Sequence, residues 1–505
     1  MTDQTYKVIA MTIYMLAMLA IGWWAYRKTN SLDDYMLAGR DLKPGVAALS
    51  AGASDMSGWL LMGLPGAIYV SGLVEGWIAV GLTAGAWLNW KFVAPRLRSY
   101  TLVSNNSITV PSFLENRLKD RSRVLRVVSG LIILVFFTFY VSSGMVAGGV
   151  FFESSFGSSY LLGMLIVAGV TIAYTLFGGF LAASYTDVVQ GLMMLAALVL
   201  VPLVGLGQVG GFGGMTDSLR EINPDMLDPI AGGTVVGIIS ALAWGLGYFG
   251  QPHIIVRFMA LRSPADAKAG RRIGVGWMLF SVVGAILTAL VGVAYFQQNN
   301  LTLSDPEAVF LELAQIFFHP LVAGFVLAAV LAAIMSTISS QLIVTSSALV
   351  EDLYKIVLKR DASPRSLVML GRMGVLLVSV VSILIALDRN ASILDLVGFA
   401  WAGFGAAFGP TILLALYWRR LTTAGALTGM IAGAAVAFLW GTFEMPGILG
   451  DVYEIIPGFL INLLLTVVVS RLTSREARVL PTSPLSMVIS SSRRLPPPYW
   501  LMATI

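Results

Sequence analysis

Runs of about 20 consecutive apolar residues recur along almost the whole chain, and they constrain the fold more than any other feature. An α-helix of about 20 apolar residues is long enough to cross the hydrocarbon core of a bilayer. The 505-residue sequence is 57% hydrophobic and only 12% charged, about half the charged fraction of a soluble domain. The sequence therefore predicts an all-α, polytopic membrane protein.

The apolar runs predict about thirteen membrane-spanning helices. The first is followed at once by Arg27 and Lys28 and lacks a small-residue cleavage site, so it is expected to be a retained span and not a signal peptide. The predicted spans are approximately 8–26, 46–70, 74–94, 126–152, 161–178, 186–206, 233–257, 273–297, 320–352, 368–387, 393–418, 424–442 and 454–471.

Basic residues are distributed unevenly between the two sets of predicted loops. Of 32 Lys and Arg residues, all but Lys7, Arg220 and Arg389 fall on the side opposite the N-terminus. Because cytoplasmic loops carry an excess of Lys and Arg, the N-terminus is expected outside and the C-terminus in the cytoplasm. The net charge of +5 comes from the basic residues of these short loops. The expected partner is therefore a lipid bilayer and not a nucleic acid. The chain contains no cysteine, which excludes disulfide bonds.

The segment Ser50–Gly66, SAGASDMSGWLLMGLPG, places an acid inside the second predicted span. A helix that begins near Gly45 would bring Asp55 about halfway across the bilayer. A charge there costs about 2.5–3.5 kcal/mol on insertion scales, so such an acid usually indicates a functional site. The alternative is an acid paired with a distant Arg or Lys for packing alone. The neighbouring glycines and serines favour a break in the helix that frees backbone groups for a ligand.

Ten of the predicted helices form two groups of five once the first span and the last two are set aside. Because five is odd, equivalent helices of the two groups run in opposite directions, as in an inverted repeat. The expected units are an extra N-terminal helix and cytoplasmic loop (1–45), a first repeat (46–206), an extracellular loop (207–231), a second repeat (232–418), two additional helices (419–472) and a cytoplasmic tail, expected to be disordered (473–505).

The first helix of the second group is then also expected to be interrupted. Its sequence, AWGLGYFGQPHIIVRF from Ala243 to Phe258, has three glycines within six residues, followed by Pro252. Proline removes a backbone donor and costs about 3 kcal/mol inside a helix, so the helix is expected to unwind near 247–251. Paired interruptions at corresponding positions are typical of a transporter binding site.

Aromatic residues near the two interruptions are candidates for the substrate site. Trp244 and Tyr248 are four residues apart and share a helical face. Together with Trp59 and Tyr140 they could enclose a small, partly apolar solute. Anchoring at the membrane interface is the alternative for any one of them, although their mid-span positions argue against it. His253, beside the second interruption, could bond a freed carbonyl or act as a ligand or proton carrier.

The predicted span 320–352 carries many hydroxyl groups in its core, AAIMSTISSQLIVTSS. Such stripes often mediate helix packing in membranes, and packing is the expectation for Ser340 and Ser347.

Adjacent hydroxyls in the same stripe indicate an ion site. Two hydroxyls, a helical carbonyl and two carbonyls freed at the first interruption would supply five neutral oxygens. Hard cations bind oxygen, and an uncharged cage suits monovalent Na⁺ better than a divalent ion. The five donors would come from Ala53, Met56, Ala333, Ser336 and Thr337.

Four segments of the sequence resemble the sodium:solute symporter family. They are ASDMSGWLLMGLPGA (Ala53–Ala67), GGFLAAS (Gly178–Ser184), WGLGYFGQPH (Trp244–His253) and AAIMSTISSQL (Ala332–Leu342). The resemblance extends from about residue 8 to 471, and the tail lies outside it. It implies a leucine-transporter-type 5+5 inverted-repeat core in a bacterial plasma-membrane protein.

The resemblance also implies roles for individual residues. It implies that Na⁺ is coordinated by Ala53, Met56, Ala333, Ser336 and Thr337. It implies ion coupling by Asp55, Arg40 and Asp187. It implies substrate binding by Ser57, Trp59, Tyr140, Trp244 and Tyr248.

The implied function is secondary active uptake of a small solute together with Na⁺. The segment ASDMSGWLLMGLPGA is similar to the branch of the family that carries L-proline, and another amino acid or small carboxylate such as pantothenate is the alternative. No cofactor besides co-transported Na⁺, and no obligatory protein partner, is expected. A channel would not need two paired interruptions. An enzyme would need a nucleophile and a base, and the two histidines suggest no such dyad. A transporter-like sensor would share this core.

Overall fold

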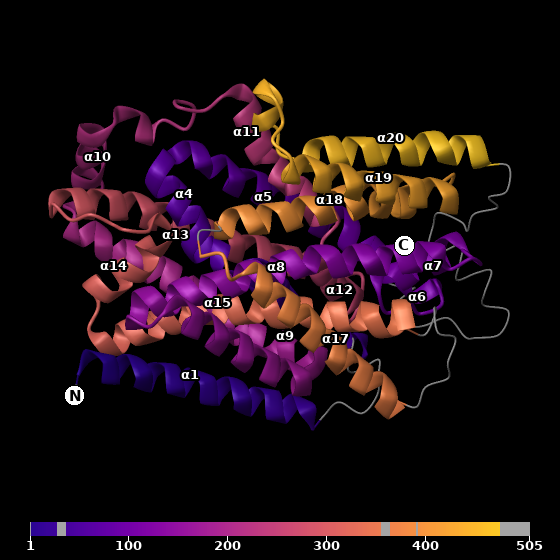
Figure 1. Ribbon diagram of the computed structural model, residues 1–505, viewed down its shortest axis with the longest axis horizontal. Helices are drawn as coiled ribbons and strands as arrows, with labels where there is room; N and C mark the ends of the chain where they lie inside the picture. Colours follow the sequence, from indigo (N-terminus) through magenta and orange to yellow (C-terminus); the bar gives the residue numbers. More distant parts are fainter. Residues whose placement is uncertain (1, 28–36, 355–363, 390–391, 475–505) are drawn as a thin grey trace.

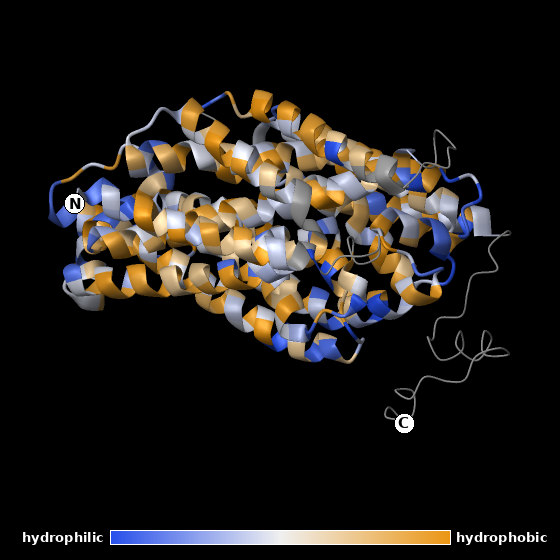
Figure 2. Ribbon diagram, turned by 90° about the horizontal axis from the view of Figure 1, so that it is seen from below, coloured by the Kyte–Doolittle hydropathy of each residue, from blue (hydrophilic) through white to orange (hydrophobic). Residues whose placement is uncertain are grey.

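Helices lie side by side along the longest axis of the molecule (Figure 1). Apolar residues run along their lengths, and hydrophilic residues gather toward the two ends of the bundle (Figure 2). We refer to the end at which the first helix begins as the N-end (left in Figure 1) and to the opposite end as the C-end. The structure is a computed structural model, and it describes residues 2–27, 37–354, 364–389 and 392–474.

The described residues contain eight helices that are long and apolar enough to cross a membrane, or nine if one bent pair counts as a span. Shorter apolar helices are present at Trp59–Ser71, Tyr160–Ala173 and Met369–Ile385. The prediction of an all-α polytopic membrane protein is confirmed, while the number of about thirteen spans stays a prediction.

Nine long helices form the body of the bundle. They are α1 (Asp3–Tyr26), α8 (Val124–Phe156), α9 (Tyr160–Gln208), α13 (Asp266–Gln298), α15 (Pro320–Ser347), α17 (Pro364–Ile385), α18 (Ile393–Tyr417), α19 (Thr423–Thr442) and α20 (Ile455–Thr473). Shorter helices connect them or cover their ends: α5 (Gly76–Leu88), α6 (Ala94–Val103), α7 (Val110–Leu118), α10 (Gly211–Ile222) and α14 (Val309–Phe317).

Two predicted spans, 161–178 and 186–206, both fall within the assigned helix α9 (Tyr160–Gln208). Its apolar stretches are Tyr160–Ala173 and Phe180–Gln208. The ring of Tyr185 lies 5.2 Å from that of Trp24, in the last turn of α1 toward the C-end. A Cβ atom added at Gly205, in contrast, would lie 2.7 Å from the ring of Phe317, at the end of α14 toward the N-end (Figure 1). The chain therefore runs toward the C-end and back within α9, as two spans require.

Both predicted interruptions are present. The second predicted span begins as α3 (Pro44–Asp55), leaves helical geometry at Met56 with ψ 75°, and resumes through a π-helical turn into α4 (Leu64–Ser71). The other interrupted span comprises α11 (Val235–Ala243), the 3₁₀ segment η6 (Trp244–Phe249) and, after an extended Gln251, α12 (Pro252–Met259).

The interrupted span α11–η6–α12 bends by 43° at its break, as the Gly and Pro pattern predicts. Its close approach to α5 requires glycine on both sides. A Cβ atom added at Gly85 would lie 2.2 Å from the carbonyl oxygen of Gly245. Both halves of this span are held against neighbouring helices: α11 and η6 pack on α5, and α12 packs on α3 and α6.

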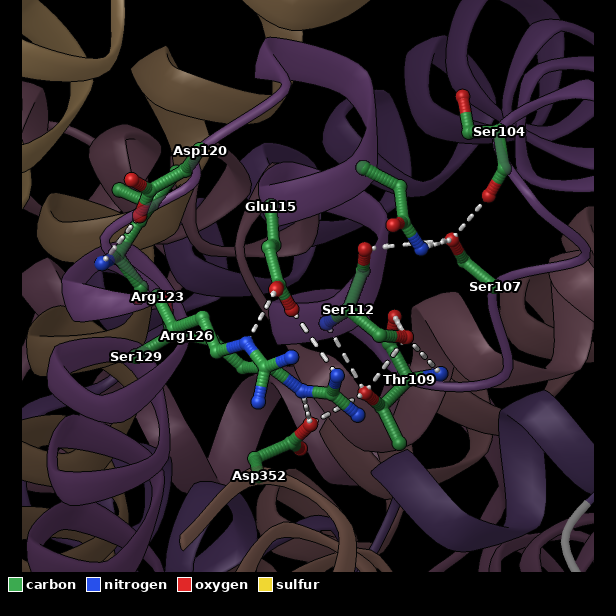
Figure 3. Close-up of polar contacts among 12 residues, drawn as sticks. Ser104, Ser107, Thr109, Ser112, Glu115, Asp120, Arg123, Arg126, Ser129 and Asp352 are labelled. Atoms are coloured by element: carbon green, nitrogen blue, oxygen red, sulfur yellow. Dashed lines mark hydrogen bonds and ion pairs between the residues drawn. The ribbon is translucent and has the colours of Figure 1, made fainter. Parts of the chain in front are cut away.

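A cluster of polar side chains joins three elements at the C-end (Figure 3). Arg126, in the first turn of α8, donates from Nε to Asp352 at 2.6 Å and from Nη1 to Glu115 of α7 at 3.0 Å. Thr109, the N-cap of α7, donates to the same Asp352 oxygen at 3.0 Å. Asp352 is fully buried in η8 (Ala348–Tyr354), the π-helical continuation of α15. The cluster therefore fixes α7, α8 and the end of α15 to one another.

Replacing Arg126 by methionine is expected to lower the free energy of unfolding by about 3 kcal/mol, because it removes the guanidinium that lies 2.6 Å from the buried Asp352 carboxylate. The measurement is thermal unfolding of the detergent-solubilised protein. The matched control is Arg220→Met, since Arg220 pairs with Asp217 where both side chains are more than 60% exposed, and such pairs contribute about 1 kcal/mol at most. Equal melting temperatures for the two variants would contradict the structural role of the cluster.

Candidate functional site

Asp55 lies at the end of α3, where the helix unwinds, and only 2% of its surface is exposed. The Tyr248 hydroxyl donates a short hydrogen bond to its Oδ2. Its backbone carbonyl accepts the Trp59 indole N–H at 3.2 Å and the Tyr140 hydroxyl at 3.3 Å. The break in α3 therefore leaves a carbonyl that two aromatic side chains satisfy, and it gathers three of the four predicted aromatic residues around one acid.

The fourth aromatic residue, Trp244, reaches the same place from the other interrupted span. Its ring centroid lies 6.4 Å from that of Trp59. The Trp401 indole of α18 donates to the Trp244 carbonyl at 2.7 Å, and its ring meets the Tyr248 ring edge-on at 5.0 Å. Trp401 was not singled out from the sequence, because its place opposite the 3₁₀ segment depends on how α18 packs.

Polar groups at the break leave capacity for a ligand. Ser57 is buried, and its backbone N–H donates to the Asp55 carbonyl at 2.9 Å. The second carboxylate oxygen of Asp55, Oδ1, is buried and has no hydrogen-bond partner within the described residues. An unpartnered buried carboxylate oxygen costs free energy unless a ligand or ion satisfies it. The site can therefore accept a further hydrogen bond or a positive charge.

Three of the five predicted ion-site donors, Ala53, Ala333 and Ser336, lie together where α15 meets the end of α3. Ser336 Oγ lies 2.8 Å from the Ala53 carbonyl oxygen and 3.0 Å from the Ala333 carbonyl oxygen. The neighbouring Thr337 hydroxyl is buried without a hydrogen-bond partner in the described structure. Met56 is the first residue beyond the helical geometry of α3. This is a set of neutral oxygens of the kind that hard cations prefer.

Asp187 forms a buried ion pair that sequence reasoning missed. Arg257 Nη2 of α12 lies 3.2 Å from its Oδ2, and the two side chains are 1% and 0% exposed. Ser50 of α3 donates to the same oxygen at 2.7 Å, and Arg257 donates to Ser340 of α15 at 2.7 Å. The pairing considered as an alternative for Asp55 therefore occurs at Asp187, and it connects α3, α9, α12 and α15.

The position of Arg257 explains why it was missed. It is the last residue of the predicted span 233–257, where basic residues usually mark the membrane edge. After the break at Gln251, every residue of α12 is buried, and Arg257 Nη1 donates to the His253 carbonyl at 2.5 Å. The spacing of Arg257 one helical turn after His253, behind a broken segment, is the signal that could have found it.

Two further residues singled out from the sequence are Arg40, which lies toward the C-end, and His253, which borders the site. Arg40 donates to the Met259 carbonyl at 2.9 Å and to Thr101 at 3.2 Å, so it holds the end of α12 at the C-end. His253 is fully buried, and neither of its ring nitrogens has a hydrogen-bond partner within the described residues. The expectation that it bonds a freed carbonyl is therefore wrong. Its ring lies 5.6 Å from that of Tyr140 instead.

Two interrupted spans that meet at a buried acid inside a helical bundle define a multi-span secondary transporter. The chain belongs to the sodium:solute symporter family, whose model matches residues 35–433. It is therefore a membrane transporter and not an enzyme.

Curated relatives align over nearly the whole chain. The high-affinity proline transporter PutP of Bacillus subtilis (strain 168) is 58% identical over 91% of this chain and 97% of its own. The osmoregulated proline transporter OpuE of the same organism is 53% identical over 93% and 96%. The sodium/proline symporter of Staphylococcus aureus (strain JH9) is 50% identical over 95% and 94%.

Solved structures share the fold at low sequence identity. The substrate-bound, outward-open state of a Na⁺-coupled sialic acid symporter aligns with a TM-score of 0.78 at 19% identity, covering 92% of this chain and 98% of that one. The nucleobase-cation-symport-1 family transporter Mhp1, in a closed conformation, aligns at 0.56 with 16% identity, covering 90% and 97%. The fold is thus the leucine-transporter type that the sequence predicts.

A double-mutant cycle is expected to show strong coupling between Asp187 and Arg257. Arg257→Gln and Asp187→Asn each leave one buried charge unpaired, which costs about 3–5 kcal/mol. The double variant removes both charges, so its loss of stability should be smaller than the sum of the two single losses. Thermal unfolding in detergent measures all four proteins. Strictly additive losses would show that the pair does not act as a unit.

Proposed function

We propose that this chain is a sodium/proline symporter that carries L-proline into the cell together with Na⁺ by alternating access. The observation that carries the proposal is the meeting of both interrupted spans with the Ser336 region of α15 around Asp55 and Ala53. The names of relatives 50–58% identical over nearly the whole chain support proline as the solute.

The chemistry of proline matches the groups at the site. Its carboxylate would lie near Ser57, where the second half of the interrupted span begins and the helix dipole favours negative charge. Its ammonium would be satisfied by Asp55 Oδ1, the buried oxygen that lacks a protein partner. Its apolar ring would pack among the aromatic side chains that surround the acid, Trp59, Tyr140, Trp244 and Tyr248.

Sodium would bind between the carbonyls of Ala53, Met56 and Ala333 and the hydroxyls of Ser336 and Thr337. An ion there holds the end of α3 against α15. Asp55, whose carboxylate would bind the solute, follows Ala53 by two residues at the same end of α3. Ion and solute would therefore stabilise the same conformation of the break. Coupling of this kind is reciprocal, since each ligand raises the affinity for the other. The membrane potential adds about 2.3 kcal/mol per 100 mV for one inward positive charge.

The remaining ion-coupling residues would act by connecting helices. Asp187, through Arg257, joins α3 and α15 to α12. Arg40 would couple ion binding to closure at the C-end, because it bonds the last turn of α12.

We assign the two repeats to 46–206 and 232–418, with additional helices at 1–45 and 419–472. The chain would lie in the bacterial plasma membrane with its N-end outside, because Arg40, Arg117 and Arg126 are at the C-end and basic residues favour the cytoplasmic side. The tail assigned to 473–505 lies, apart from its first two residues, outside the described residues.

Removing both ion-site hydroxyls, Ser336→Ala with Thr337→Ala, should raise the Na⁺ concentration for half-maximal proline uptake about tenfold or more, because two oxygen ligands are lost. Proline affinity at saturating Na⁺ should change less. The control is Ser347→Ala, because the Ser347 hydroxyl donates to the Ile343 carbonyl of its own helix. A fall in proline affinity with an unchanged Na⁺ response would place the ion elsewhere.

Uptake of labelled L-proline into proteoliposomes tests the function and the driving ion together. An inward Na⁺ gradient is expected to drive accumulation, whereas a pH gradient of equal membrane potential in Na⁺-free buffer is not. Neutral oxygens do not carry protons near neutral pH, so proton coupling would leave the Ser336 and Thr337 hydroxyls without a role. Labelled pantothenate serves as the comparison solute. Accumulation driven by the pH gradient alone, or preference for pantothenate, would overturn the corresponding part of the proposal.

A further inference from the structure

A cavity of about 460 Å³ opens at the N-end between the second interrupted span, the start of α18 and the loop 447–454; we refer to it as the vestibule. Four acidic residues line it, and no Lys or Arg is among the described residues of its wall. Such a field favours the approach of cations. The acidic residues are Glu75, Asp395, Asp451 and Glu454.

Two aromatic residues of the vestibule wall contact each other. Tyr453, from the loop before α20, stacks on Trp244 with ring centroids 5.2 Å apart and planes inclined by 20°. The Tyr453 hydroxyl donates to the Gly398 carbonyl in α18 at 2.6 Å. A Cβ atom added at Gly398 would lie 3.2 Å from the Trp244 ring. The rings of Tyr453 and Trp244 therefore pack on each other and on the first turns of α18.

Trp244 marks the boundary between the vestibule and the site around Asp55. It lines the vestibule and also contacts Trp59, whose indole N–H bonds the Asp55 carbonyl. Neither Trp59 nor Asp55 belongs to the vestibule wall. A row of three rings, Tyr453, Trp244 and Trp59, thus extends from the vestibule to the buried acid.

The loop that carries Tyr453 is attached to the interrupted span through one serine. Ser240 of α11 donates to the Asp451 carbonyl at 2.8 Å and accepts the Tyr453 backbone N–H at 3.0 Å. With the hydroxyl bond to Gly398, three hydrogen bonds and one ring stack hold the loop against α11 and α18. The loop itself connects α19 and α20, which lie outside the ten helices assigned to the repeats.

We infer that Tyr453 is a positioning residue for transport: stacked on Trp244, it closes the passage between the vestibule and the substrate site, and the loop 447–454 moves away from α11 and α18 when the solute enters. The inference rests on the proposed function, because it assumes that the site around Asp55 receives the solute. According to this inference, the loop between α19 and α20, which follows the two repeats in the chain, forms part of the gate to the substrate site.

Labelling of an introduced cysteine tests the barrier without any assumption about the solute. The chain contains no cysteine, so Ser57→Cys gives a single reactive thiol on the far side of the Trp244 ring. Its rate of reaction with a membrane-impermeant methanethiosulfonate, added from the vestibule side, is expected to rise about tenfold when Tyr453→Leu removes the ring stack and the hydrogen bond.

Two variants show whether the effect belongs to this ring. Tyr453→Phe keeps the stack and should restore a rate within about threefold of the parent. Tyr160→Leu is the matched control, because the Tyr160 hydroxyl also bonds a backbone carbonyl, that of Ala386 at 2.7 Å, away from the vestibule. An unchanged rate in Tyr453→Leu, or an equal rise in Tyr160→Leu, would overturn the inference.

A reversible lock tests the movement of the loop. In the double variant Ser240→Cys with Val452→Cys, a short bifunctional methanethiosulfonate would hold the loop on α11. Uptake of labelled proline is expected to fall at least about tenfold while the link is present and to return on reduction, whereas each single variant stays active with the same reagent. Undiminished uptake by the linked protein would overturn the inference. Absence of uptake by the unmodified chain would instead overturn the proposed function. The labelling rates would still show whether Tyr453 closes the passage to Ser57.

Discussion

The structure depends on how a helix can be interrupted inside a membrane. A backbone polar group without a partner in hydrocarbon costs several kcal/mol, so a break persists only where other groups bond the freed atoms. At the first break, the Asp55 carbonyl accepts the Trp59 indole and the Tyr140 hydroxyl. At the second, the Trp401 indole donates to the Trp244 carbonyl, and the Gln251 side chain donates to the Gly247 carbonyl at 3.2 Å. The aromatic side chains that stabilise the breaks are therefore the same ones that line the candidate site.

The same arrangement would connect the proposed ion site to the proposed solute site. The Ala53 carbonyl, a proposed Na⁺ ligand, accepts a hydrogen bond from Ser336, and the Asp55 carbonyl, two residues later, accepts hydrogen bonds from Trp59 and Tyr140. A shift at either position changes the geometry of the short unwound segment between α3 and the following π-helical turn. In the proposed cycle, that segment is the element through which Na⁺ and the solute act on each other.

The parts of the fold that depend on local chemistry could be predicted from the sequence. The glycines and serines around Asp55 indicated the first break, and the odd number of helices in each group, together with glycine and proline, indicated its counterpart near Gln251. Residues whose roles depend on tertiary packing could not be found in this way. The pairing of Arg257 depends on how α12 packs against α9, and the role of Tyr453 depends on a loop, distant in sequence, that lies on Trp244.

The buried charges give the centre an asymmetry that favours a cation. Asp187 is neutralised by the Arg257 guanidinium, which is part of the chain and cannot leave. Asp55 has a tyrosine hydroxyl and no ion pair within the described residues, so its carboxylate is compensated by a hydrogen bond alone. An uncompensated carboxylate in a low-dielectric interior is costly, and a nearby cation lowers that cost. In the proposed cycle, the protein therefore carries a permanent counter-ion at Asp187 and takes a mobile one, the ammonium of the solute, at Asp55. Closure of the site then depends on the presence of the solute, while Na⁺ on the neutral oxygens beside Ala53 stabilises the same segment.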